Sequence, residues 1–112
     1  MKPLSKTALE EFLKRFEYFK DGELRNIEIN SPNNISLTFA TQDSSRAYDW
    51  VSVKIEFDSV TNASLLDNSN LNHVDMSGGI DIKNSGTEFA FKIKNSTCQI
   101  NSSYIKYIEG QF

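Results

Sequence analysis

The chain contains only one histidine, His73, and only one cysteine, Cys98, in 112 residues. A lone cysteine cannot form a disulfide within the chain, and this usage is typical of proteins in a reducing cytoplasm. One histidine and one cysteine do not reach the ligand number of a zinc site unless two carboxylates join them. We therefore expect a cytoplasmic protein without a bound metal. Cys98 alternates with Ile100, which predicts a buried thiol, whereas His73 stands beside an Asn-rich stretch and is expected at the surface.

Catalytic and nucleotide-binding motifs are also missing. The sequence has no Gly-x-Ser-x-Gly elbow, no Gly-x-x-x-x-Gly-Lys loop and no Gly-x-Gly-x-x-Gly turn. The stretch from Asp67 to Asp75 has the Asn and Asp residues of a calcium loop but lacks its central glycine and final glutamate. These absences predict a non-enzyme with neither a metal nor an organic cofactor. The catalytic alternative is a hydrolase that uses a carboxylate pair, either Glu56 with Asp58 or Asp43 with Asp49.

Long apolar runs are absent, so we expect no membrane-spanning segment and no secretory signal. The net charge is −3. Residues 21–82 hold ten acidic and three basic side chains, a local charge near −7 that repels phosphate backbones and anionic membranes. We therefore expect neither a nucleic-acid nor a membrane partner. The acidic middle of the chain either keeps the protein soluble or forms a negative face for a basic partner.

What the sequence does contain is a regular alternation of apolar side chains with other side chains. Segments 35–39, 51–57 and 89–93 place apolar side chains at every second position, the period of a strand with one buried face. Residues 24–29 and 35–39 flank a turn-rich Asn-Ser-Pro-Asn-Asn segment and predict a hairpin. Further strands are expected at 50–57, 63–66, 74–76, 80–83, 88–92, 97–101 and 104–108, with a bend at 58–59 and tight turns at 84–87 and 101–103.

One amphipathic helix is predicted over residues 7–20. Thr7 and Glu10 have the spacing of a capping box at its start, and Gly22 can take the left-handed conformation that ends a helix. An apolar stripe recurs at helical spacing through Leu9, Phe12, Leu13, Phe16 and Phe19.

The fold expected from these elements is a single α+β domain over residues 1–112. Its N-terminal helix should pack on a largely antiparallel sheet, which can curl towards a barrel or a sandwich. A barrel-like sheet leaves small-ligand binding as an alternative function.

The candidate functional residues gather in the segment 43–50. Arg, Tyr and the only Trp stand within five residues there, and these types dominate the hot spots of protein interfaces. The alternative is structural: Trp50 packs over the sheet edge, and Arg46 pairs with Asp43 or Asp49. The partner-binding residues that we predict are Asp43, Arg46, Tyr48, Asp49 and Trp50.

Two short stretches resemble a family of small β-rich bacterial immunity proteins. Residues 19–24 (Phe-Lys-Asp-Gly-Glu-Leu) are similar to the Phe-His-Asp-Ala-Glu-like segment that precedes the family's first strand, and residues 55–60 are similar to a later strand step. Lys20 stands where the family's histidine usually is, so no role of that histidine carries over. The resemblance implies a cytoplasmic protein-binding module that neutralises a bacterial toxin. If the acidic middle of the chain is a binding face, the expected partner is a basic toxin domain.

Overall fold

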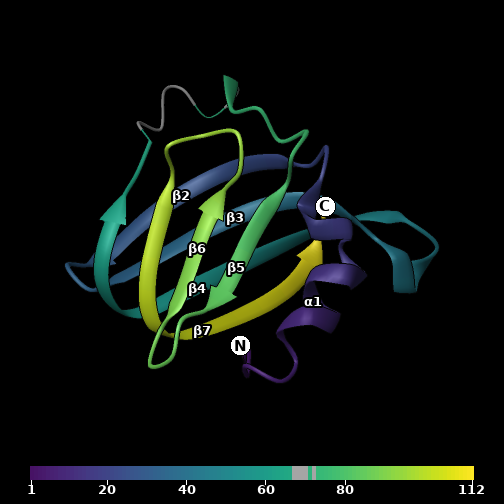
Figure 1. Ribbon diagram of the computed structural model, residues 1–112. Helices are drawn as coiled ribbons and strands as arrows, with labels where there is room; N and C mark the ends of the chain where they lie inside the picture. The colour runs from purple at the N-terminus through teal and green to yellow at the C-terminus, as the bar shows by residue number, and fades with distance from the viewer. Residues whose placement is uncertain (67–70, 72) are drawn as a thin grey trace.

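The computed structural model describes residues 1–66, 71 and 73–112. In these residues seven strands form one antiparallel sheet in the order β2-β3-β4-β7-β6-β5, with β1 added to β7 (Figure 1). The stretch from Asp67 to Asp75, compared above with a calcium loop, lies partly outside the described residues. The elements are β1 (Lys2–Pro3), α1 (Leu9–Arg15), η1 (Glu17–Phe19), β2 (Glu23–Ser31), β3 (Asn34–Asp43), η2 (Ser44–Arg46), β4 (Asp49–Ser64), β5 (Ile80–Asn84), β6 (Phe89–Ile93) and β7 (Gln99–Gln111).

The predicted alternation is confirmed in β4, where one set of side chains is buried and the intervening set is partly exposed. The strand is longer than predicted. It continues through the bend expected at 58–59, where Ser59 takes a positive φ of 54° and the register shifts between Val60 and Asn62. Residues 63–64 of the short strand predicted at 63–66 are therefore the end of β4, and residues 65–66 are not in a strand. The buried set is Val51, Val53, Ile55 and Phe57.

The tight turn predicted at 101–103 is wrong, because these residues lie inside the continuous strand β7. Ser102 pairs with Val60 of β4 on one side and with Phe89 of β6 on the other. Pairing on both sides keeps this polar segment extended. The hairpin β5–β6 and its turn near 84–87 are confirmed, whereas residues 74–76 form no strand.

The helix is shorter than predicted, and its expected ends are wrong. It begins at Leu9 after Ala8, without a side-chain cap. The Thr7 hydroxyl bonds Ser5 instead, and Glu10 accepts a hydrogen bond from the Tyr18 hydroxyl. The helix ends at Arg15, and the following η1 turn has positive φ at all three of its residues.

The η1 turn keeps the phenylalanine stripe buried even though the helix has ended. Phe12, Phe16 and Phe19 are all buried, as predicted. The ring of Phe19 packs on that of Phe39 of β3, with 5.1 Å between centroids. The ring of Phe12 packs on that of Tyr107 of β7, with 4.7 Å between centroids. This aromatic burial offsets the roughly 1–2 kcal/mol that each left-handed residue costs.

Gly22 has a different role from the predicted one. Its φ is not positive, but a Cβ at this position would lie 2.6 Å from the carbonyl oxygen of Ala40. Gly22 is therefore required by the close approach of β2 to β3, and not by a left-handed helix end.

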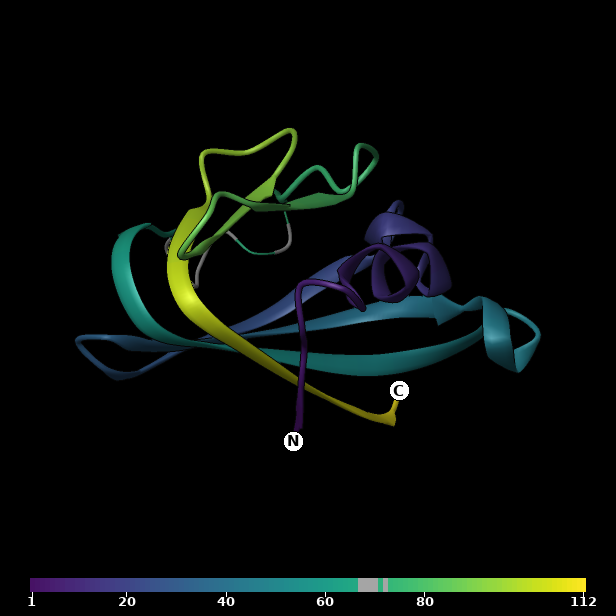
Figure 2. The same cartoon turned by 60° about the horizontal axis from the view of Figure 1, so that its bottom comes forward.

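The sheet bends strongly along β7, so that β5 and β6 stand over β2, β3 and β4 (Figure 2). It does not close into a barrel, because β2 and β5 form its two ends. Helix α1 lies at the open side of the resulting concave face (Figure 2). That face is filled by buried phenylalanine rings, including Phe39, Phe57 and Phe91. The rings of Phe39, Phe57 and Phe91 thus occupy the middle of the space that the curved sheet encloses.

Cys98 is buried, as predicted, and burial raises the pKa of its thiol to about 11. His73 is exposed, also as predicted. No helix in the described part of the chain is both long and apolar enough to cross a membrane.

Candidate functional site

The predicted partner-binding segment is a tight loop between β3 and β4. The single turn η2 (Ser44–Arg46) is followed by Ala47 and Tyr48, both with left-handed φ values of 56° and 64°. The loop closes where the backbone N–H of Tyr48 donates to the carbonyl of Asp43 at 2.9 Å. This conformation presents Tyr48 to solvent, and the residue is 52% exposed.

Asp43 holds this loop from beneath the surface. Its side chain is fully buried, although the sequence predicts it as a contact residue. It accepts hydrogen bonds from the backbone N–H and the hydroxyl of Ser45, at 3.0 and 2.8 Å. Asp43 therefore positions the loop and offers no surface to a partner.

Arg15 of α1 is the charged partner of Asp43. Its guanidinium donates to both carboxylate oxygens of Asp43, at 3.0 and 2.7 Å, and to both oxygens of Glu109 in β7, at 2.8 and 2.6 Å. This pairing lowers the pKa of the Asp43 carboxyl to about 2 and raises the pKa of Arg15. Arg15, and not Arg46, is therefore the basic residue that pairs with Asp43. Arg15 lies 28 residues before Asp43, and local spacing gives no sign of it.

Trp50 lies beside a residue from the far end of the chain. Its indole packs against the ring of Phe112 with 5.6 Å between centroids. The guanidinium of Arg25, from β2, lies 4.7 Å from the centroid of the same ring. These aromatic and cation–π contacts hold Phe112 between Trp50 and Arg25 on the surface.

A hollow of about 300 Å³, the aromatic hollow, opens at this contact. The structure therefore brings Arg46, Asp49 and Trp50 of the predicted set together in one place. Sequence analysis missed the residues that β7 and its end contribute, because no local pattern places them next to β4. The lining residues are Arg46, Asp49, Trp50, Val51, Gly110, Gln111 and Phe112.

The aromatic hollow belongs to the outer face of the sheet, which is opposite to the helix. Residues at even positions of β4 and of the second half of β7 point to this face, as the pairings of Lys54 with Ile108 and of Asp58 with Tyr104 indicate. Of the seven large hydrophobic side chains exposed in the described residues, five lie on this face. We call these five the outer patch: Met1, Trp50, Tyr104, Ile108 and Phe112.

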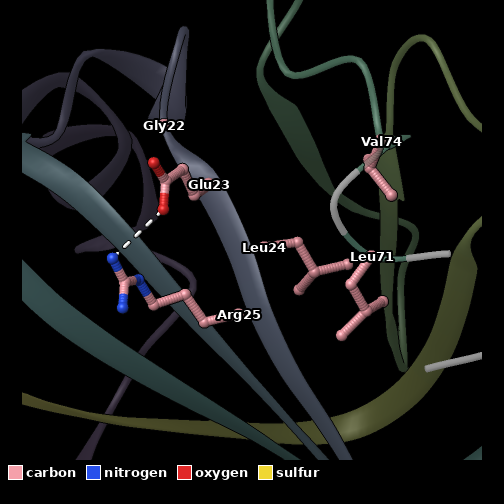
Figure 3. Close-up of a pocket in the computed structure, with 6 residues that line it drawn as sticks. All are labelled: Gly22, Glu23, Leu24, Arg25, Leu71 and Val74. Atoms are coloured by element: carbon pink, nitrogen blue, oxygen red, sulfur yellow. Dashed lines mark ion pairs between the residues drawn. The ribbon is translucent and has the colours of Figure 1, made fainter. Parts of the chain in front are cut away.

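A second hollow of about 440 Å³, the edge hollow, lies at the free edge of β2 (Figure 3). The side chain of Leu24 points towards Leu71 across it, with Val74 nearby (Figure 3). On the other side of the strand Arg25 pairs with Glu23 at 3.1 Å. The edge hollow is lined by Gly22, Glu23, Leu24, Arg25, Leu71 and Val74.

The carboxylate pairs are both brought together, and the shift at Asp43 is opposite to that of a general acid. Glu56 and Asp58 share the outer face, where the Asn34 amide donates to both, at 3.2 and 3.4 Å. Asp43 and Asp49 face each other in the β3–β4 register. A general acid needs a raised pKa, whereas that of Asp43 is lowered. Over the described residues, no three His, Cys, Asp or Glu side chains gather as metal ligands.

The acidic middle of the chain is spread over the fold. The carboxylate of Asp43 is neutralised by Arg15, and that of Glu28 pairs with Lys54 at 3.3 Å. The outer face therefore carries charges of both signs between its apolar side chains. Comparison of the chain with protein-family models, curated proteins and solved structures finds no match.

Proposed function

We propose that this chain is a protein-binding module and that the outer patch is its contact surface. The observation that carries the proposal is the gathering of exposed apolar side chains on one sheet face, opposite a concave face that is already filled. Isolated exposed apolar residues are ordinary on a protein surface, but several on one face, with Trp50 and Phe112 in direct contact, favour an interaction site.

The residue types and their preorganisation support the same proposal. Trp50 lies against Phe112, and Tyr48 is held out by a loop that Asp43 fixes from inside. Trp, Tyr and Arg are the types most enriched among interface hot spots. Side chains already fixed in the free protein lose less conformational entropy on binding, which favours affinity.

A toxin of a competing bacterium is the partner we propose, as the immunity-protein resemblance implies. Residues 19–24, which carry that resemblance, run from η1 into the start of β2. They end beside Arg25, whose guanidinium contacts Phe112 of the outer patch. A net charge of −3 favours a basic toxin domain by long-range attraction. The proposed location of this encounter is the cytoplasm.

The test is binding to the product of the gene next to this one, measured by calorimetry with purified proteins. Trp50→Ala combined with Phe112→Ala should weaken binding roughly 30-fold or more, because two aromatic contacts are lost. Lys83→Ala is the control, since Lys83 is exposed in β5, at the opposite end of the sheet from β2 and outside the outer patch. Equal affinity of all three proteins would show that the outer patch is not the contact surface.

A further inference from the structure

Among the residues that the structure describes, β2 pairs with β3 alone and has no strand on its other side. β2 stands at the end of the sheet, and within the described residues no turn or loop backbone group bonds residues 23–31. On the free side of an antiparallel edge strand, alternate residues direct both N–H and C=O outward. An extended peptide backbone can form hydrogen bonds with such a row of N–H and C=O groups.

The edge hollow adds side-chain selectivity to this row. Leu24, Leu71 and Val74 form an apolar wall on the concave side of β2, while Glu23 and Arg25 lie on the other side (Figure 3). Because successive side chains of a strand point to opposite faces, an added strand would place one apolar side chain against this wall. Its two neighbours would lie beside the Glu23–Arg25 ion pair and should be polar or charged.

We infer that the open edge of β2 binds an extended segment of the partner protein by strand addition, with one apolar side chain against Leu24, Leu71 and Val74. The inference rests on the proposed function, because Arg25 lines the edge hollow and also contacts Phe112 of the outer patch. One partner can therefore contact both the edge hollow and the outer patch. A second copy that paired β2 with β2 would extend the sheet sideways and leave the outer patch uncovered.

Arg25 offers a sharp test of the backbone contact. The register shifts between Leu24 and Asn26, so Arg25 has no partner residue in β3. Proline is tolerated at such bulges and on edge strands, and it removes one N–H. Arg25→Pro therefore removes one backbone donor from β2, whereas Arg25→Ala removes the guanidinium and keeps the donor.

The experiment selects binders from a displayed library of random linear dodecapeptides against the immobilised chain. Enriched peptides should carry an apolar residue between polar neighbours. They should also slow amide hydrogen exchange in β2. Arg25→Pro should weaken their affinity roughly tenfold, and Arg25→Ala by less than about threefold. Should Arg25→Pro fail to fold, Val74→Asp, which places a charge in the edge hollow, should cause the same loss.

The inference is overturned if no peptide is enriched, if the enriched peptides protect another element, or if they bind Arg25→Pro as tightly as the wild type. It is also overturned if the wild type sediments as a dimer that Arg25→Pro converts to monomer, because the occupant is then a second copy. A partner that needs Trp50 and Phe112, together with peptides that leave β2 unprotected, removes this inference and keeps the proposed function. A partner that binds the Trp50 and Phe112 variant as tightly as the wild type, together with peptides that protect β2, removes only the role of the outer patch.

Discussion

Asp43 connects the core of this protein to its proposed contact surface. The residue lies at the end of β3, and its carboxylate accepts hydrogen bonds from Arg15 on one side and from Ser45 on the other. The hydroxyl of Ser44 also donates to the backbone carbonyl of Arg15, at 2.7 Å. The loop that presents Tyr48 is therefore bonded to the helix through two neighbouring residues.

Stability should depend on acid pH through Asp43. The pKa of its carboxyl is about 2 in the fold against an ordinary 3.8, so the ionised form is favoured by folding. The resulting stabilisation is complete above pH 5 and is lost as the pH falls through about 2. It amounts to about 2 kcal/mol. Urea unfolding midpoints between pH 5 and pH 2 should fall in the wild type and fall less in Asp43→Asn; parallel profiles would contradict this role.

At neutral pH, Asp43→Asn should lower the free energy of unfolding by about 2–3 kcal/mol, because Arg15 loses a bidentate partner and keeps only Glu109. Glu28→Gln is the control. It breaks the more exposed ion pair with Lys54 and should cost less than about 0.5 kcal/mol. Chemical denaturation measures both, and equal small losses would mean that the buried pair contributes no more than a surface pair.

Among the elements, α1 and η1 act as one apolar unit. The ring of Phe16 packs against the rings of Phe12 and Phe19, at centroid distances of 5.3 and 5.4 Å, and is fully buried. Phe16→Ala should therefore cost roughly 3–5 kcal/mol. Tyr104→Ala, at an exposed position, should cost less than about 1 kcal/mol. A loss below about 1 kcal/mol for Phe16→Ala in denaturant titrations would refute the packing of this unit on the sheet.

The start of β2 depends on the absence of a side chain at Gly22. Gly22→Ala should destabilise by roughly 1–3 kcal/mol, because the added Cβ meets the carbonyl of Ala40 at 2.6 Å. Gly110→Ala is the matched control, since no atom lies within 4 Å of a Cβ there. Thermal melts of both variants decide the matter, and a Gly22→Ala protein as stable as Gly110→Ala would argue against this close approach.

At the scale of the whole molecule, the bent strand β7 joins two parts of the sheet. It pairs with β4 along most of its length and with β6 and β1 on its other side. Strands β4 and β7 therefore have neighbours on both sides, while β2 and β5 are the ends. The same arrangement leaves the outer face of the sheet exposed and gives β2 a sheet neighbour on one side only.

Amide hydrogen exchange should follow this arrangement. Amides of β4 and β7 near Ile55 and Ile105 should exchange slowest, since their hydrogen bonds lie inside the sheet, and alternate amides of β2 should exchange fast. Exchange measured by NMR on the free protein tests the order. Protection of every β2 amide as strong as that of β4 would mean that this edge is already paired in the free protein.

The sequence alone determined those features of the fold that follow from a strand or helix period of apolar residues. Alternation predicts the buried face of β4 and the β2–β3 hairpin, and helical spacing predicts the burial of Phe12, Phe16 and Phe19. These predictions succeed because solvent selects which side chains turn inward, and this selection acts locally. The ends of the helix could not be read in the same way. At its start Thr7 bonds Ser5 and Glu10 bonds Tyr18 in place of the capping box, and at its end the η1 turn buries Phe19 against β3.

Only the tertiary structure decided the site. Local composition drew attention to residues 43–50, but Arg15 reaches Asp43 from the helix, and Phe112 reaches Trp50 through the β4–β7 pairing. The polar segment 101–103 reads as a turn, yet ladders on both sides keep it in β7. Pairing between distant strands depends on the whole sheet and leaves no period in the sequence. For that reason the sequence predicted which residue types face solvent, and the fold decided which of them meet.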